Sequence, residues 1–431
     1  MTEPSLPEVV RIAQDLIRFD TSNYGGGNAK GEREAAEYVG AYLQELGLEV
    51  EYYEPIDRRT SVMARVRGRH PERSALVVHG HLDVVPAVAD DWTVDPFAGV
   101  VKDGMLWGRG AVDMKNMNAM ILTAVADILR AGEQPARDLV LVFFADEENG
   151  GVEGSALAVR HRPHWFAGAA EAISEVGGYS IDVDGRRAYL LQVGEKALIW
   201  IRLVATGRAG HGSRLHDDNA VTALAEAVAA IGRTRWPVRL TPTTEALLRG
   251  LSDLSGRSDD DPDALAAAAG PAEAFLRSSL RTTTNPTALS AGYKHNVIPE
   301  RAEALIDVRV IPGTEDEVLA ELQAIVGDDI EIETVVRDIG METPFEGDLV
   351  DAMVASLNHH DPGVPVIPYL LGAGTDNKAL AALGITGYGF APLRLPADLD
   401  FTGMFHGVDE RVPVESLVFG QRVLADLLRT Y

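Results

Sequence analysis

The 431-residue chain contains no cysteine. This absence excludes a disulfide framework, a thiolate metal site and a cysteine nucleophile, so any metal must be held by histidine and carboxylate side chains. Positive charge is also scarce, because 39 lysines and arginines stand against 65 aspartates and glutamates, for a formal net charge of -26. A surface of that sign repels nucleic acid and anionic membranes, and we expect neither as a partner.

Long apolar runs are missing as well. No segment is an unbroken apolar stretch long enough to cross a bilayer, and residues 1–8 have neither the basic nor the apolar region of a signal peptide. These two absences predict a cytoplasmic protein.

What the chain does contain is an alternation of apolar runs and helical periodicity. Such alternation is typical of an α/β fold with a mostly parallel sheet flanked by helices. In the first part of the chain we expect strands over 61–67, 75–79 and 139–144, and helices over 118–130 and 154–160.

The length predicts two domains, and the pattern changes near Glu195. Strands over 197–205 and 303–310, with helices over 220–232 and 315–326, predict an inserted α+β lid or dimerisation domain. Residues 241–280 are expected to be an extra helical elaboration inside it. After residue 336 the chain returns to the pattern of the first part. The prediction is therefore one discontinuous catalytic domain, made of residues 1–195 and 337–431, and one inserted domain, residues 196–336.

Three acids follow the apolar run 139–145 directly: Asp146, Glu147 and Glu148, with a glycine pair behind them. In open α/β sheets ligands bind outside the carboxyl ends of the strands, so these acids are candidates for catalysis. A solvated acidic turn is the alternative.

Similar residues recur at other expected strand ends and glycine turns. His81 and Asp83 form an H-x-D unit after another apolar run, and alternation along an extended chain points both side chains to one face. Asp113 lies in a glycine-spaced turn, where it is also a candidate helix N-cap. Glu175 ends an apolar run before two glycines, and His406 lies near the C-terminus. Two histidines and three carboxylates suit a pair of divalent ions such as zinc, cobalt or manganese.

In this order, the motifs H-x-D, G-x-x-D-x-K, D-E-E-x-G-G, a later acid and a C-terminal H-G resemble the M20 metallopeptidases. That group includes aminoacylases, carboxypeptidase G, carnosinases and succinyl-diaminopimelate desuccinylases. The resemblance implies a zinc-exopeptidase-like catalytic domain and two metal ions, zinc in the first place. It implies that His81 and Glu175 hold one metal, that Glu148 and His406 hold the other, and that Asp113 bridges them. It also assigns Glu147 as general base and Asp83 as the carboxylate that orients His81.

The resemblance extends to the substrate side. The loop around His211 is similar to one whose histidine reaches the partner subunit's active site in this family, so a homodimer is expected. Without the resemblance, His211 would be interpreted as a turn residue. Asn296 and Arg309 match positions that meet the substrate, where a guanidinium fork would grip a terminal carboxylate. Gly374 and Thr375 lie in a glycine-rich loop that lines the pocket.

The expected function is therefore hydrolysis of an amide bond in N-acyl amino acids or small peptides with a free carboxylate. The enzyme would be an N-acyl-amino-acid deacylase or a dipeptidase or carboxypeptidase. The alternatives are an N-succinyl-type deacylase and a non-catalytic homologue that binds a metal or ligand. The related aminopeptidases order their ligands similarly but lack the inserted domain.

Overall fold

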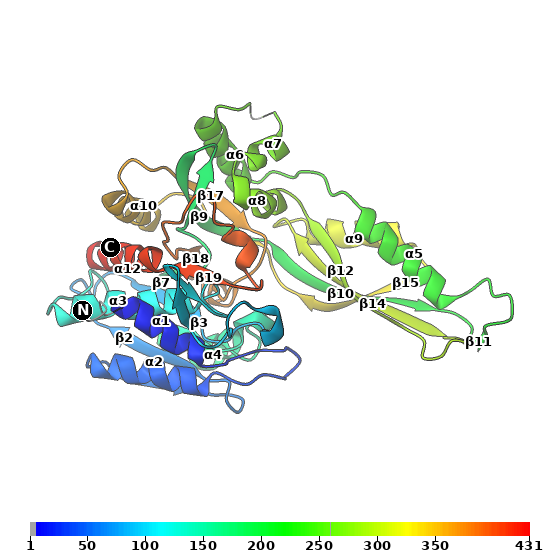
Figure 1. The fold of residues 1–431 in the computed structure, drawn as a ribbon, viewed down its shortest axis with the longest axis horizontal. Helices are drawn as coiled ribbons and strands as arrows, with labels where there is room; N and C mark the ends of the chain where they lie inside the picture. Colours follow the sequence, from blue (N-terminus) through cyan, green and yellow to red (C-terminus); the bar gives the residue numbers. More distant parts are fainter. Residues whose placement is uncertain (1–5, 259) are drawn as a thin grey trace.

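The computed structural model describes residues 6–258 and 260–431. The first five residues of the N-terminal stretch used above for localisation lie outside this description. Figure 1 shows a larger body, which holds both termini, and a narrower arm that extends from it. No helix among the described residues has the length and apolar character needed to cross a membrane.

A ten-stranded sheet forms the centre of the larger body. Its strands run in the order β1-β2-β6-β3-β7-β18-β9-β16, with β8 and β17 also paired to β9. The central strands β6, β3, β7 and β18 run parallel to one another. The bounds are β1 (Val50–Tyr53), β2 (Ser61–Val66), β3 (Ala75–His81), β6 (Leu139–Phe144), β7 (Ala169–Ser174), β8 (Ser180–Val183), β9 (Arg186–Glu195), β16 (Met341–Glu342), β17 (Val366–Leu371) and β18 (Thr386–Gly389).

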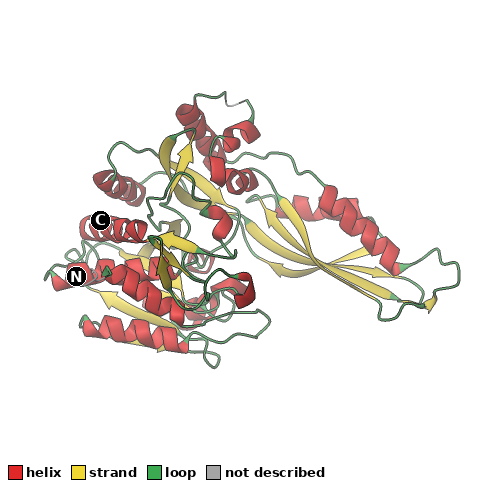
Figure 2. Ribbon diagram, viewed as in Figure 1, coloured by secondary structure: helices red, strands yellow, loops and turns green. Residues whose placement is uncertain are grey.

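Helices cover both faces of this sheet, as Figure 2 illustrates. Every residue of β6 is buried, because alternate side chains enter two different cores. On one face lie α1 (Glu8–Arg18), α2 (Arg33–Glu45), α3 (Lys115–Arg130) and α12 (Val414–Thr430), and on the other α4 (Ser155–His161) and α11 (Asn377–Ala381). The remaining elements of the body are α10 (Asp348–His360) and a small sheet of β4 (Val100–Lys102), β5 (Met105–Trp107) and β19 (Arg411–Pro413). The predicted fold class is confirmed.

The arm is a separate four-stranded antiparallel sheet with its own core. The chain enters it where β9 passes into β10 and leaves it between β15 and β16. Its elements are β10 (Ala197–Thr206), α5 (Ala220–Arg233), β12 (Thr283–Ala291), β14 (Arg301–Val310), α9 (Glu315–Val326) and β15 (Ile330–Arg337), with the short pair β11 (Gly210–His211) and β13 (Val297–Ile298) at its tip. The domain boundaries stated above stay a prediction.

The helical segment 241–280 does not lie inside the arm, so that expectation was wrong. It forms α6 (Pro242–Ser255), α7 (Pro262–Ala267) and α8 (Glu273–Ser279), whose leucines join the core of the larger body. Helix α6 packs against β17 and β9, and its Gly250 lies against Ile367 of β17. The sequence position between two strands of the arm suggested the wrong partner, because local periodicity says which face of a helix is apolar but not what covers it.

Candidate metal centre and active site

The predicted site residues come from the carboxyl ends of three neighbouring strands. Because β6, β3 and β7 are adjacent and parallel, their ends meet at one edge of the sheet. His81 is the last residue of β3, the turn Glu147–Asn149 follows β6, and Glu175 follows β7. The turn before α3 brings Asp113 to the same place, and the loop before β19 brings His406.

Asp113 lies between the two histidines. Its Oδ1 is 3.1 Å from His81 Nε2, and its Oδ2 is 3.3 Å from His406 Nε2. Glu175 Oε2 lies 3.6 Å from His81 Nε2, whereas Glu148 Oε2 lies 2.9 Å from His406 Nε2. The five residues therefore form two groups of three that could each hold a metal ion, and the groups share Asp113.

Glu147 belongs to neither group. Its Oε2 lies 3.9 Å from His81 Nε2, beyond hydrogen-bond reach. Its carboxyl borders the same cavity as four of the candidate ligands, Asp113, Glu148, Glu175 and His406. The turn thus directs Glu148 at His406 and leaves its neighbour Glu147 outside both candidate metal groups.

Asp83 contacts both His81 and the acidic turn. The nearest partner of His81 Nδ1 is the backbone carbonyl of Asp83 at 3.0 Å, and the carboxylate Oδ1 is farther, at 3.5 Å. That contact leaves Nε2 to face Asp113. The carboxylate of Asp83 also accepts hydrogen bonds from the backbone amides of Glu147 and Glu148, at 3.0 and 3.1 Å. It holds the acidic turn in place.

Glu410 does the same for the Asp113 loop, and motif reading did not single it out. Its side chain is fully buried and accepts the backbone amides of Gly110, Val112 and Asp113 at 2.6 to 3.1 Å. Arg109 pairs with it at 2.7 Å. A carboxylate four residues after His406 was visible in the sequence, but its partners lie about 300 positions away along the chain.

Without a cation, the carboxylates of the site are crowded. Burial raises the pKa of Glu175 to about 8, with repulsion from Asp113 adding to it. Burial likewise raises the pKa of Glu147 well above its ordinary value, and the neighbouring Glu175 adds to this effect. Burial is also the largest influence on His406, but its contacts with Asp113 and Glu148 together outweigh burial and raise the pKa to about 11. The site favours any added positive charge.

A cavity of about 760 Å³ connects this cluster to the arm. Arg309 of β14 lines it, and its Nε and Nη2 donate to Asp307 at 2.6 and 2.9 Å. Gly374 and Thr375 line the same cavity. Thr375 donates through its backbone amide and its hydroxyl to the buried Glu195, at 2.9 and 2.6 Å, so the end of β9 fixes the glycine-rich loop.

His211 and Asn296 do not reach this cavity within one chain. Both are exposed and lie next to each other at the tip of the arm, where Gly212 N donates to Asn296 O at 3.0 Å. His211 Nδ1 lies 2.8 Å from Ser213 Oγ. Of the predicted site residues, these two are the ones that the fold keeps apart from the metal centre.

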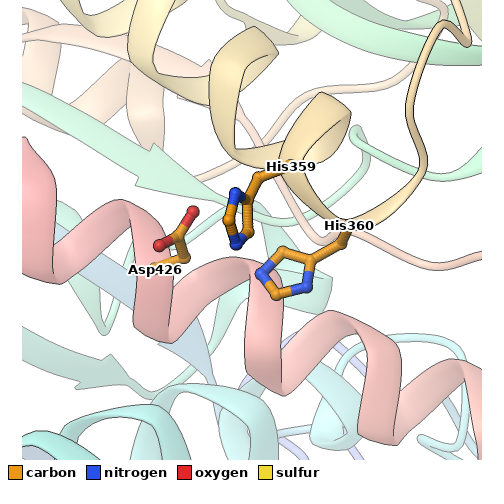
Figure 3. Close-up of side chains that lie close together, drawn as sticks. All are labelled: His359, His360 and Asp426. Carbon is orange, nitrogen blue, oxygen red and sulfur yellow. The ribbon is translucent and has the colours of Figure 1, made fainter.

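A third histidine and carboxylate group lies elsewhere. His359 and His360 at the end of α10 face Asp426 of α12 (Figure 3), and the two imidazole ring centres are 4.9 Å apart. Among the residues that the structure describes, no ion pair of 4.0 Å or less joins Asp426 to either ring. This group is looser than the two at the strand ends.

The doubly covered α/β sheet, the inserted arm and the histidine and carboxylate cluster at the strand ends define a metallohydrolase. The profile of Peptidase family M20/M25/M40 matches residues 77–430. The chain belongs to this family, which confirms the resemblance and identifies it as a hydrolase of amide bonds.

Named relatives agree with this assignment. Human aminoacylase-1 is 27% identical over 374 residues, 84% of this chain and 81% of the relative. A probable carboxypeptidase S-like 2 of Dictyostelium discoideum is 28% identical over 378 residues, 83% of this chain and 71% of the relative. The crystal structure of an M20 family metallo-carboxypeptidase from Sulfolobus solfataricus matches with a TM-score of 0.75 at 19% identity, over 98% of this chain and 99% of the other.

Proposed function

We propose that this chain is a dinuclear-metal hydrolase of N-acyl amino acids or small peptides that bear a free carboxylate. The observation that carries the proposal is Asp113, whose two oxygens face two different histidines at 3.1 and 3.3 Å. A carboxylate with one imidazole at each oxygen is the arrangement expected of a ligand that bridges two ions.

The donor set fits such ions. Each group offers one imidazole nitrogen and two carboxylates, a combination that suits zinc, cobalt or manganese, with zinc in the first place. Burial and mutual repulsion of the acids raise the pKa of Glu175, and a bound cation would offset both effects. When bound, the two ions would polarise the amide carbonyl and acidify a water.

Glu147 supplies the general base in this proposal. Its carboxylate belongs to neither metal group, yet it borders the cavity beside both. A bound cation would offset the burial and repulsion that raise its pKa, and would favour the ionised, proton-accepting form. Glu147 would then take a proton from water and pass it to the leaving amine.

The substrate carboxylate is assigned to Arg309. Asp307 occupies the side of the guanidinium formed by Nε and Nη2, which fixes the orientation of the group. The end formed by Nη1 and Nη2 is left for a substrate carboxylate. Gly374 and Thr375 would form another wall of the pocket, held by Glu195.

The homodimer stays a prediction, and so does the cytoplasmic location. The exposure of His211 and Asn296 at the tip of the arm supports the dimer, because an active-site role for them would require the site of another subunit. The N-succinyl-type deacylase is the main alternative. The non-catalytic homologue would require a missing ligand or base, and the chain retains all six of these residues.

A substrate panel tests the proposal. The protein is loaded with zinc or cobalt, and turnover is measured on N-acetyl amino acids, dipeptides and N-succinyl amino acids, with Glu147→Ala as the blank. We expect turnover of at least one of the first two classes and loss of that turnover in the blank. A protein with two bound ions and no turnover of any member would contradict the catalytic proposal, and preference for N-succinyl compounds would select the alternative.

A further inference from the structure

Behind the acidic turn lies a buried polar network that the proposed chemistry does not use. At its centre is Arg59, which lies just before β2 and is 4% exposed. Its two terminal nitrogens donate to Glu32 and to Asp146, both of which are fully buried. Its Nε lies 3.3 Å from Glu153.

Asp146 connects this arginine to the turn that carries Glu147 and Glu148. Its backbone is in the left-handed region, with φ of 67°, which an aspartate adopts only at a cost of about 1 kcal/mol or more. Three contacts hold it there. Arg59 and Asn23 donate to its Oδ1, and the amide of Glu153 donates to Oδ2 at 2.6 Å.

The network continues to the other support of the turn. Asn23 Nδ2 also donates to Asp83 Oδ2 at 2.9 Å, and Asp83 accepts the amides of Glu147 and Glu148. Asn23 therefore links Asp83 and Asp146, the two carboxylates that hold the turn. Arg59 provides the positive charge that faces this group of acids. Burial and repulsion from Asp83 raise the pKa of Glu32, and its pairing with Arg59 opposes that rise.

We propose that Arg59 is a positioning residue, which acts through Asp146 to fix the backbone of the acidic turn and so the directions of Glu147 and Glu148. The physical reason is that two neighbouring glutamates can serve different purposes only while the turn keeps one geometry. A lysine would keep the charge but could not contact Glu32, Asp146 and Glu153 together, because it has one nitrogen where arginine has three. The catalytic part of this inference rests on the proposed function.

Arg137 provides a matched control. It is also buried, at 2% exposure, and pairs with Glu171 at 2.8 Å. It precedes β6, whereas Asp146 follows the same strand, so the two networks lie at opposite ends of β6. Arg59→Lys and Arg137→Lys thus remove comparable contacts, one behind the site and one remote from it. Asp146→Asn is a third variant that keeps the shape of the side chain but removes its charge.

The experiment measures hydrogen exchange of the peptide that spans residues 145–151 in the metal-free protein, together with zinc affinity, kcat and KM. We expect faster exchange in Arg59→Lys and Asp146→Asn than in Arg137→Lys at equal global stability. We also expect a loss of about 10- to 100-fold in zinc affinity or kcat with little change in KM, the usual effect of removing a residue that supports a metal ligand. If Arg59→Lys fails to fold, Asp146→Asn carries the comparison.

Equal exchange in the three variants would overturn the inference, whatever the activity of the wild type. A wild-type protein that neither binds zinc nor turns over any substrate would contradict the proposed function instead. In that case, exchange confined to the Arg59 and Asp146 variants would still support a role in holding the turn.

Discussion

Glu147 and Glu148 offer a sharp test because they are adjacent in sequence and differ in surroundings. Glu148 lies 2.9 Å from His406 and belongs to a candidate metal group, whereas Glu147 lies 3.9 Å from His81 and belongs to neither group. We predict that Glu147→Gln loses activity and keeps its metal, and that Glu148→Gln loses metal.

The size of each effect follows from the role. Removing a general base costs about 10²- to 10⁴-fold in kcat, or roughly 3 to 5 kcal/mol of transition-state stabilisation. Replacing the carboxylate of Glu148 by an amide should weaken metal binding by at least the roughly 10- to 100-fold seen for outer residues of metal sites. Because burial and Glu175 disfavour the charged form of Glu147, the metal-free Glu147→Gln protein should be no less stable than the wild type.

The assay combines metal content after dialysis, thermal unfolding of the metal-free protein, and kcat at saturating zinc. A Glu147→Gln protein that is stripped of metal, or that keeps more than about a tenth of the wild-type rate, would refute the separation of roles. So would a Glu148→Gln protein that stays fully loaded.

Three other predictions concern the surroundings of the site. The folded state binds the proton of Glu175 more tightly than the unfolded chain does, so this contribution to stability is complete below about pH 4.5 and is lost as the pH rises through 8. Unfolding of the metal-free protein should therefore become easier from pH 6 to 8, by up to about 1.4 kcal/mol per pH unit for this group, and zinc should abolish the trend. Glu410→Gln should lower the melting temperature and the zinc affinity together, since losing one partner of a buried ion pair costs about 3 to 5 kcal/mol; an unchanged melting curve would contradict the role of this residue. If His211 serves the partner's site, mixing inactive His211→Ala with inactive His406→Ala should restore part of the activity in the mixed dimer, and a strictly monomeric protein by native mass would exclude this outcome.

Much of the site could be predicted because its signals are local. Apolar runs identified the strands, and the acids or histidines directly after them identified the ends at which ligands bind. His81, Glu148 and Glu175 each follow such a run by a few residues. The same local reading could not identify the supporting residues, because Asp83 reaches Glu147 across 64 positions and Glu410 reaches Asp113 across 297. For Asp146, it indicated no role beyond shaping the turn, whereas its contact with Arg59 spans 87 positions.

The fold class, the inserted arm and the candidate metal ligands could all be predicted from the sequence, since periodicity and strand-end chemistry are properties of short segments. The three-dimensional packing was needed to show which strands are neighbours, and hence that the ends of β6, β3 and β7 bring the acids and His81 together. It also decided that helices α6 to α8 join the larger body and that His211 is remote from its own cavity. These features depend on which apolar face covers which, and that choice is made by packing between segments far apart in the chain.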